Sequence, residues 1–138
     1  MLKNVVIFGL GNIAELAAFY LTRDAGRRVV SFAVDAAYVT SPSWNGLPVV
    51  AWEEVERHYP PESTDVFVAV SYTKLNKLRR DKVAEARTKG YGIASYVSSR
   101  ATIFEDFIPQ PNQLILEDNT IQPFALIGEN VTLWSGNH

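Results

Sequence analysis

The chain has 138 residues, a net charge of −2 and no cysteine. The lack of cysteine excludes disulfide bonds, thiolate metal sites and a cysteine nucleophile, and the near-neutral charge argues against nucleic-acid binding. Apolar residues make up 47% of the sequence, which is typical of a folded domain, and no apolar run approaches the length of a membrane span. Because a strand-like segment starts almost at once, without an apolar leader, we expect a cytoplasmic protein.

The first 35 residues predict a βαβ unit. Residues 5–8 form a continuous apolar run, which is typical of a parallel strand buried on both faces. After a glycine turn, apolar residues recur at positions i, i+3, i+4, i+7 and i+8, which predicts an amphipathic helix that ends at Gly26. Residues 29–34 form the next apolar strand, and Asp35 closes it.

The turn at residues 9–14 has the spacing of a nucleotide-binding turn, with Gly9, Gly11 and Ala14 at its key positions. Gly9 permits the tight turn, Gly11 lets the backbone approach a pyrophosphate, and Ala14 lets the helix pack close to the strand. Free N–H groups at the start of the helix then face the anion. Asp35 is a candidate acceptor for a ribose hydroxyl or a base N–H. The alternatives are a turn that is glycine-rich for its geometry alone and an aspartate that only caps a turn.

Residues 41–97 predict the rest of an α/β sheet. They read in order as a loop, a short strand at residues 47–50 that its proline places near an edge, and a helix at 52–59. A buried strand at 65–70, a long basic helix through about Lys89 and a last strand at 92–97 follow. Strands that alternate with helices predict a doubly wound parallel sheet, so we assign residues 1–96 to a small Rossmann-like domain.

The segment after the strand at residues 65–70 lies where ligands bind in open α/β sheets. The side chains of Ser71, Tyr72 and Lys74 are candidates to close over the same pyrophosphate. The alternative is an ordinary helix cap. We interpret the basic residues farther along this helix as a solvated face: Lys77, Arg79, Arg80 and Lys82.

A period of six residues organises the last third of the chain, residues 97–138. Six of the seven positions that start a hexad are aliphatic, and Pro109 is the exception. The six are Val97, Ile103, Ile115, Ile121, Ile127 and Leu133. This period is typical of a left-handed parallel β-helix built from hexapeptide repeats, in which three hexads close one coil. The alternative is a run of ordinary short strands. Two coils and one further face fit into this stretch, so we expect more coils after residue 138.

A small nucleotide-binding α/β domain that leads directly into hexapeptide coils resembles the sugar O-acyltransferase family. This family includes sialic acid O-acetyltransferases and bacterial nucleotide-sugar N-acetyltransferases. The resemblance rests on the glycine turn, on Asp35, on residues 46–49 and 68–71, and on the hexads. It implies a nucleotide-sugar acceptor held by the N-terminal domain, acetyl-CoA as co-substrate, no metal and a homotrimer. It also implies that Gly9, Gly11 and Asn12 hold the pyrophosphate and that Asp35 holds the base or ribose.

Two positions depart from the pattern of this family. Asn12 stands where many members carry a further glycine or a histidine. The general base of the family is a histidine in a later coil, which we expect after residue 138, with His138 as the second choice. This chain alone is therefore expected to be inactive. Two other functions stay open, namely an NAD(P)-binding redox or regulatory domain and a trimerising scaffold without catalytic activity.

Overall fold

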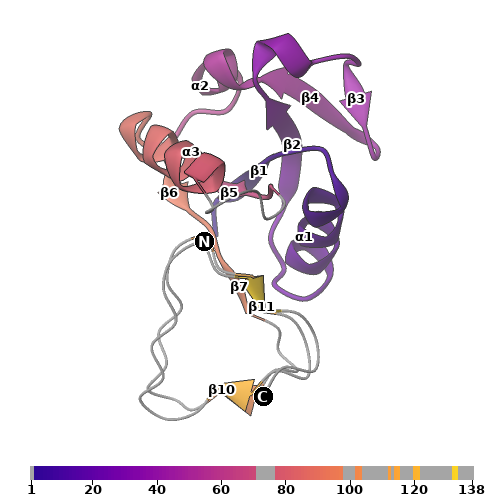
Figure 1. Ribbon diagram of the computed structural model, residues 1–138, viewed down its shortest axis with the longest axis vertical. Helices are drawn as coiled ribbons and strands as arrows, with labels where there is room; N and C mark the ends of the chain where they lie inside the picture. Colours follow the sequence, from indigo (N-terminus) through magenta and orange to yellow (C-terminus); the bar gives the residue numbers. More distant parts are fainter. Residues whose placement is uncertain are drawn as a thin grey trace.

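A computed structural model describes residues 2–70 and 77–97, together with residues 102–103, 112, 114–115, 120–121 and 132–133. The N-terminal part is a six-stranded sheet in the order β3-β4-β2-β1-β5-β6 with helices on both faces (Figure 1). Its strands are β1 (Asn4–Phe8), β2 (Val29–Val34), β3 (Ser43–Trp44), β4 (Leu47–Ala51), β5 (Thr64–Val68) and β6 (Gly92–Ile93). All neighbouring strands in it are parallel except β3 and β4. The predicted α/β fold is therefore confirmed, but the sheet is mixed and not wholly parallel as expected.

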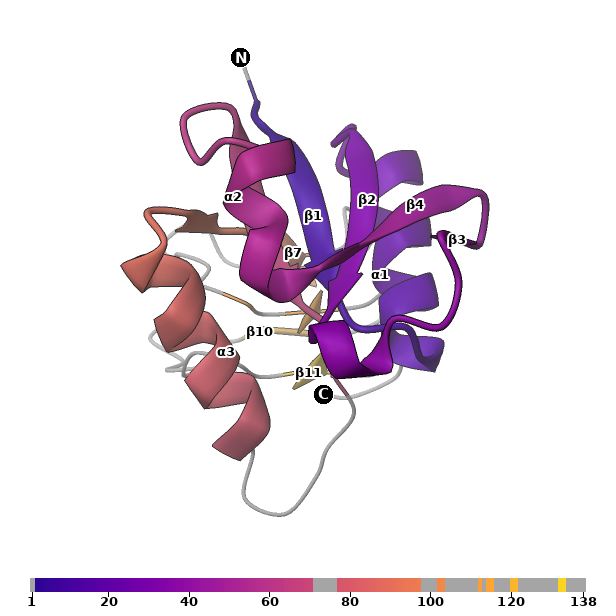
Figure 2. The same cartoon turned by 90° about the horizontal axis from the view of Figure 1, so that it is seen from above.

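Both faces of the sheet are covered, which explains the continuous apolar run of β1. Helix α1 (Asn12–Arg23) covers one face, while α2 (Val55–His58) and α3 (Lys77–Thr88) cover the other (Figure 2). Val5 and Ile7 pack in the cluster on the α1 side, and Val6 and Phe8 pack with residues of α2 and α3. Side chains that alternate between two buried faces require an apolar residue at every position.

Two predicted elements near β4 differ in detail. The strand at residues 47–50 is not at the edge of the sheet, because β3 pairs with its outer side. Pro48 is tolerated because the parallel pairing with β2 starts only at Val49, so the missing N–H of the proline costs no hydrogen bond there. The helix expected at residues 52–59 is a 3₁₀ turn, η2 (Trp52–Glu54), followed by the short α2.

The strand predicted at residues 92–97 is divided into β6 and β7 (Tyr96–Val97). Beyond the end of β6, the side chain of Asn112 lies beside β5 in its place. After Ala94, which donates to the carbonyl of Val66, the chain leaves the edge of β5. There the Asn112 amide accepts from the Val68 N–H at 2.6 Å and donates to the Val68 carbonyl at 2.9 Å. Asn112 is 2% exposed and has a φ of 58°. Its side chain therefore replaces a neighbouring strand at the end of β5.

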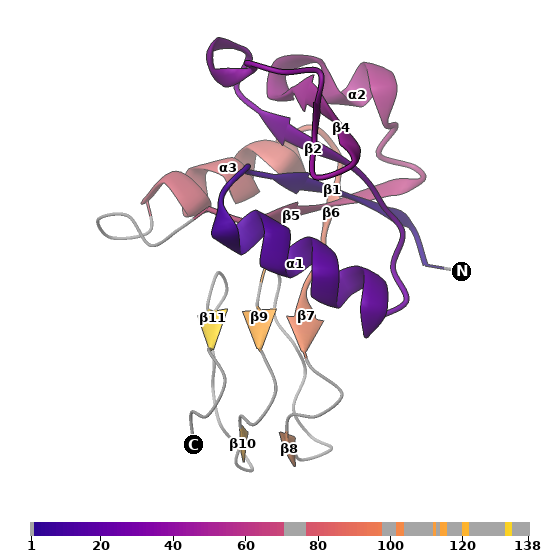
Figure 3. The ribbon, with the colours of Figure 1, turned by 90° about the vertical axis from the view of Figure 1, so that its right-hand side faces the viewer.

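The later strands pair in parallel at a fixed spacing. They are β8 (Thr102–Ile103), β9 (Leu114–Ile115), β10 (Thr120–Ile121) and β11 (Thr132–Leu133). Tyr96 of β7 pairs with Leu114, and Leu114 pairs with Thr132, in each case 18 residues later in the chain. Strands β8 and β10 pair with the same spacing (Figure 3).

Among the described residues, no helix has the length and apolar character needed to cross a membrane.

The buried hydroxyl of Tyr91 makes the stability of the fold sensitive to alkaline pH. It donates a hydrogen bond to the Tyr59 carbonyl, and burial together with the carboxylates of Glu56 and Glu62 raises the pKa of Tyr91 to about 12. Because the pKa is higher in the folded state, this stabilisation is complete below about pH 10 and is lost as the pH rises to about 12.

We therefore expect the Tyr91→Phe variant to be less stable than the wild type at neutral pH, with a difference that shrinks between about pH 10 and 12. Urea unfolding across this pH range measures that difference. Tyr38→Phe is the matched control, because Tyr38 is 70% exposed and should show no such trend. A difference for Tyr91→Phe that stays constant with pH would contradict the prediction.

Candidate functional site

A pocket of about 430 Å³ opens where β1 and β5 end and α1 begins. It is lined by Gly9, Leu10, Gly11, Asn12, Ile13, Ala69, Val70 and Leu78. The structure therefore brings together the three pocket residues that the sequence singled out in the glycine turn. It adds Ala69 and Val70, which follow β5, and Leu78 of α3. The sequence placed a ligand site directly after this strand but did not single out these three residues.

Gly9 holds the turn close to β5. Its φ is 125°, and a Cβ placed on it would lie 2.4 Å from the carbonyl oxygen of Ala69. The two segments are also joined by a hydrogen bond of 2.8 Å from the Ala69 N–H to the Phe8 carbonyl. Only glycine fits this combination of backbone angle and close approach. The prediction that Gly9 is needed for the tight turn is consistent with this geometry.

Gly11 is the N-cap residue of α1 and faces open space. Its φ of −98° is an ordinary extended value, and among the described residues no atom other than those of its chain neighbours lies within 4 Å of a Cβ placed on it. The first helical hydrogen bond runs from the Glu15 N–H to the Gly11 carbonyl, and Gly11 has no side chain that could cap this end of α1. The exposed Asn12 starts the helix. The N–H groups of the first turn therefore point into the pocket region with the positive end of the helix dipole.

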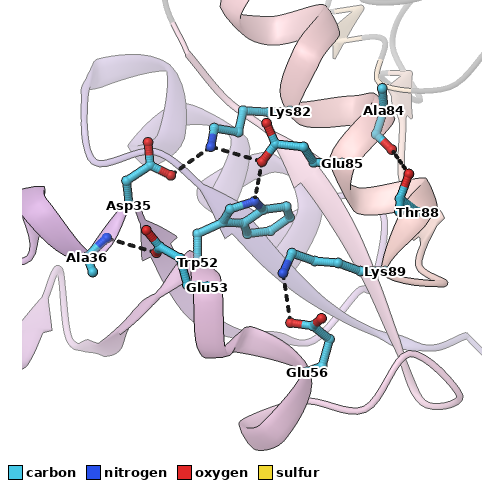
Figure 4. Close-up of polar contacts among 10 residues, drawn as sticks. All are labelled: Asp35, Ala36, Trp52, Glu53, Glu56, Lys82, Ala84, Glu85, Thr88 and Lys89. Atoms are coloured by element: carbon cyan, nitrogen blue, oxygen red, sulfur yellow. Dashed lines mark hydrogen bonds and ion pairs between the residues drawn. The ribbon is translucent and has the colours of Figure 1, made fainter.

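Asp35 lies next to this turn in the sheet. The Gly9 N–H donates to the Ala33 carbonyl at 2.9 Å, and Asp35 follows Ala33 by two residues at the end of β2. Its carboxylate is about one-third exposed and accepts a hydrogen bond from Lys82 Nζ at 2.7 Å (Figure 4). Asp35 is thus near the glycine turn, but it does not line the pocket itself.

The interpretation of α3 as carrying a solvated basic face is wrong for Arg79 and Lys82. Arg79 is 2% exposed and donates to the Val70 carbonyl at 2.9 Å, and Lys82 is buried against the sheet. Burial alone would lower the pKa of Lys82, but hydrogen bonds to Asp35 and Glu85 outweigh it and raise that pKa. The sequence pattern did not indicate this, because long basic side chains can cover apolar residues and still reach an acceptor.

A second group of polar contacts, beyond Lys82, joins η2 and α2 to α3 and to Lys89, which directly follows α3. Glu85 accepts from the Trp52 indole N–H at 3.0 Å, and Lys89 pairs with Glu56 at 2.9 Å (Figure 4). Burial opposes ionisation of Glu56, but the hydrogen bond from Lys89 prevails and lowers its pKa. These contacts hold the two helices together. Among the described residues, no three His, Cys, Asp or Glu side chains cluster as metal ligands.

Four predicted site residues fall outside the described ranges, namely Ser71, Tyr72, Lys74 and His138. Their roles stay predictions. His58 is exposed at the end of α2.

No protein-family model and no curated protein matches this chain. Solved structures match it in fold. The acetyltransferase domain of PglB from Neisseria gonorrhoeae superposes with a TM-score of 0.78 at 21% identity, over 97% of this chain and 63% of that one. This chain shares its fold with that domain. The same domain in complex with acetyl coenzyme A matches with a TM-score of 0.72 at 20% identity, over 99% of this chain and 60% of that one.

PerB from Caulobacter crescentus, in complex with CoA and GDP-perosamine, has a TM-score of 0.79 at 21% identity, over 99% of this chain and 62% of that one. The resemblance inferred from the sequence is thereby confirmed at the level of the fold. The chain spans less than two thirds of the length of each of these neighbours.

Proposed function

We propose that this chain is the nucleotide-sugar-binding portion of a cytoplasmic, acetyl-CoA-dependent sugar acetyltransferase. The observation that carries the proposal is the pocket between the glycine turn and the end of β5, in a fold shared with a protein whose structure holds CoA and GDP-perosamine. The pocket lies at the carboxyl ends of parallel strands, where open α/β sheets bind ligands. Its volume is of the size that small-molecule sites have.

In this proposal the pyrophosphate lies over the turn formed by Gly9, Gly11 and Asn12, at the positive end of α1. The open space beside Gly11 supports this placement, because backbone N–H groups can approach an anion only where no side chain intervenes. Asp35 accepts hydrogen bonds from the ribose or the base. Ser71, Tyr72 and Lys74 follow β5 in the sequence, and in this proposal their side chains also bind the pyrophosphate.

We further propose that residues 1–96 form the acceptor-binding domain and residues 97–138 the first coils of a left-handed parallel β-helix. Parallel pairs that recur after 18 residues support the second part, because three hexads make one coil of such a helix. In the whole protein, which we propose is a homotrimer, these coils would contribute to the acetyl-CoA site. No metal is required for this reaction.

The proposed reaction is acetyl transfer from the CoA thioester to a hydroxyl or amine of the sugar. A general base removes the proton from the attacking group, a bond forms to the acetyl carbonyl carbon, and the CoA thiolate leaves. We propose that this base is a histidine of a later coil, with His138 as the alternative within residues 1–138. The role of the described residues is to hold the acceptor.

Replacing Gly11 by valine should abolish binding of nucleotide-sugars and leave the fold intact. The valine side chain would fill the space that the pyrophosphate needs, while its extended backbone and open surroundings accept it. Isothermal titration with UDP- and GDP-sugars and with NAD measures the effect, and the wild type should bind a nucleotide-sugar more tightly than NAD.

Thr22→Val is the matched control, because Thr22 is exposed near the far end of the same helix. If Gly11→Val bound nucleotide-sugars as tightly as the wild type, the proposal that the pyrophosphate lies at this turn would be wrong. Binding of NAD that equals or exceeds that of every nucleotide-sugar would instead favour the NAD(P)-binding alternative.

A further inference from the structure

Lys82 of α3 reaches across the carboxyl ends of three strands. Its side chain is 9% exposed, and its ammonium lies 5.0 Å from the ring centre of Phe8 and 5.9 Å from that of Trp52. Phe8 ends β1 directly before the glycine turn, and Trp52 follows β4. The ammonium donates to Asp35 at 2.7 Å and to Glu85 at 3.1 Å. Two aromatic rings and two carboxylates therefore hold it in one place, and Figure 4 shows the Trp52 ring and both carboxylates.

The second carboxylate is itself held. The Trp52 indole N–H donates to the same Glu85 oxygen, Oε1, that accepts from Lys82. Trp52 is 2% exposed and packs edge-to-face on Phe8 with ring centres 5.3 Å apart. The packing of Trp52 and its hydrogen bond to Glu85 therefore restrict the position of Lys82. Lys82 in turn restricts the position of the Asp35 carboxylate.

Asp35 is the partly exposed end of this chain of contacts. One of its oxygens, Oδ1, accepts from Lys82, which sets the direction of the second oxygen. A carboxylate that is ionised in an ion pair only accepts hydrogen bonds. A ligand group at this position must then donate, as the vicinal hydroxyls of an unphosphorylated ribose do. The Glu53 carboxylate accepts a hydrogen bond from the Ala36 N–H at 2.9 Å, so it lies beside Asp35 in the chain. Its negative charge disfavours a phosphate at this position.

We propose that Lys82 is a positioning residue that orients Asp35 toward the ribose hydroxyls of the bound nucleotide, and that this pair determines the preference of the site for ribose. The inference rests on the proposed function, since it assumes that a nucleotide binds beside the glycine turn. It assigns a role to a residue of α3 that lies outside the pocket, and it makes the packing of α3 part of nucleotide recognition.

The test compares GDP and UDP with their 2′,3′-dideoxy counterparts by isothermal titration of the 138-residue chain. In the wild type the ribose form should bind about tenfold more tightly, the size of effect expected from charge-assisted hydrogen bonds. In Lys82→Met this ratio should fall below about threefold, while the dideoxy nucleotides keep roughly their wild-type affinity. Lys82→Arg should keep most of the ratio, because arginine is also a cationic donor.

Arg80→Met is the matched control, since Arg80 is an exposed cation on the same helix, and it should leave the ratio unchanged. Lys82→Gln replaces the methionine variant if that variant does not fold, and the same fall in the ratio is expected from it. An unchanged ratio in the Lys82 variants, or an equal loss of affinity for ribose and dideoxy forms, would overturn the positioning role and leave the proposed function standing. Failure of the wild type to bind either diphosphate would overturn both.

Discussion

Replacing Asn112 by alanine should lower the free energy of unfolding by about 2–5 kcal/mol. The change removes both hydrogen bonds that the side-chain amide makes to Val68. Val68 is fully buried, so its N–H and carbonyl would lose their partners at this edge of β5 without access to water. An unsatisfied buried polar group costs about 1–3 kcal/mol, and a small domain has only about 5–15 kcal/mol in total. Urea unfolding at neutral pH measures the loss.

Two variants separate the hydrogen bonds from the backbone angle at this position. Asn112→Gly loses the same two bonds but accepts the positive φ, so it should be about 1 kcal/mol less destabilised than Asn112→Ala. Asn45→Ala is the control, because Asn45 also has a positive φ, of 50°, but is exposed. It should cost only about 1 kcal/mol. A similarly small cost for Asn112→Ala would show that the amide does not support the end of β5.

Replacing Gly9 by alanine should cost about 2–6 kcal/mol of stability and also eliminate nucleotide binding. The φ of 125° is strained for any residue with a side chain, and the new methyl group would lie 2.4 Å from a backbone oxygen of Ala69. Neither the turn nor the end of β5 can relieve the contact without moving a wall of the pocket. Thermal and urea unfolding, followed by titration with nucleotide-sugars, measure both effects.

Gly11→Ala provides the matched comparison in the same turn. Gly11 has an extended backbone, and in the part of the chain that the structure describes no atom beyond its chain neighbours lies within 4 Å of a Cβ placed on it. The change should therefore cost less than about 1 kcal/mol. If Gly9→Ala were as stable as Gly11→Ala, the close approach of the turn to β5 would not be a requirement of the fold.

The sequence predicted much of the pocket because the relevant signals are local. The spacing of Gly9, Gly11 and Ala14 after an apolar strand specifies a turn and a helix start, whatever the rest of the chain does. Leu78 and Ala69 could not be assigned in the same way. They reach the pocket only because β5 lies next to β1 and α3 folds back over the sheet, and such contacts between distant segments leave no periodic pattern.

Lys82 and Asn112 show most clearly what local patterns leave undetermined. In the sequence, Lys82 is one of several basic residues on a helix, and Asn112 is a polar residue within degenerate hexads. A charged or polar side chain has the same local preferences whether it is solvated or paired. The partner that decides between the two lies 47 residues away for Lys82 and 44 residues away for Asn112.

By itself, the sequence determined the order of the longer strands and helices, the glycine turn and the six-residue period, but it missed β3, which it assigned to a loop. The features that it did determine depend on backbone preferences and on burial that repeats along a short segment. Only the tertiary structure decided that β4 is covered by β3, that the strand at residues 92–97 is divided, and that Asp35 is held by Lys82. These features depend on which backbone groups and charges are left without a partner once the sheet has formed. Which groups find a partner is decided only when the distant segments come together in the folded chain.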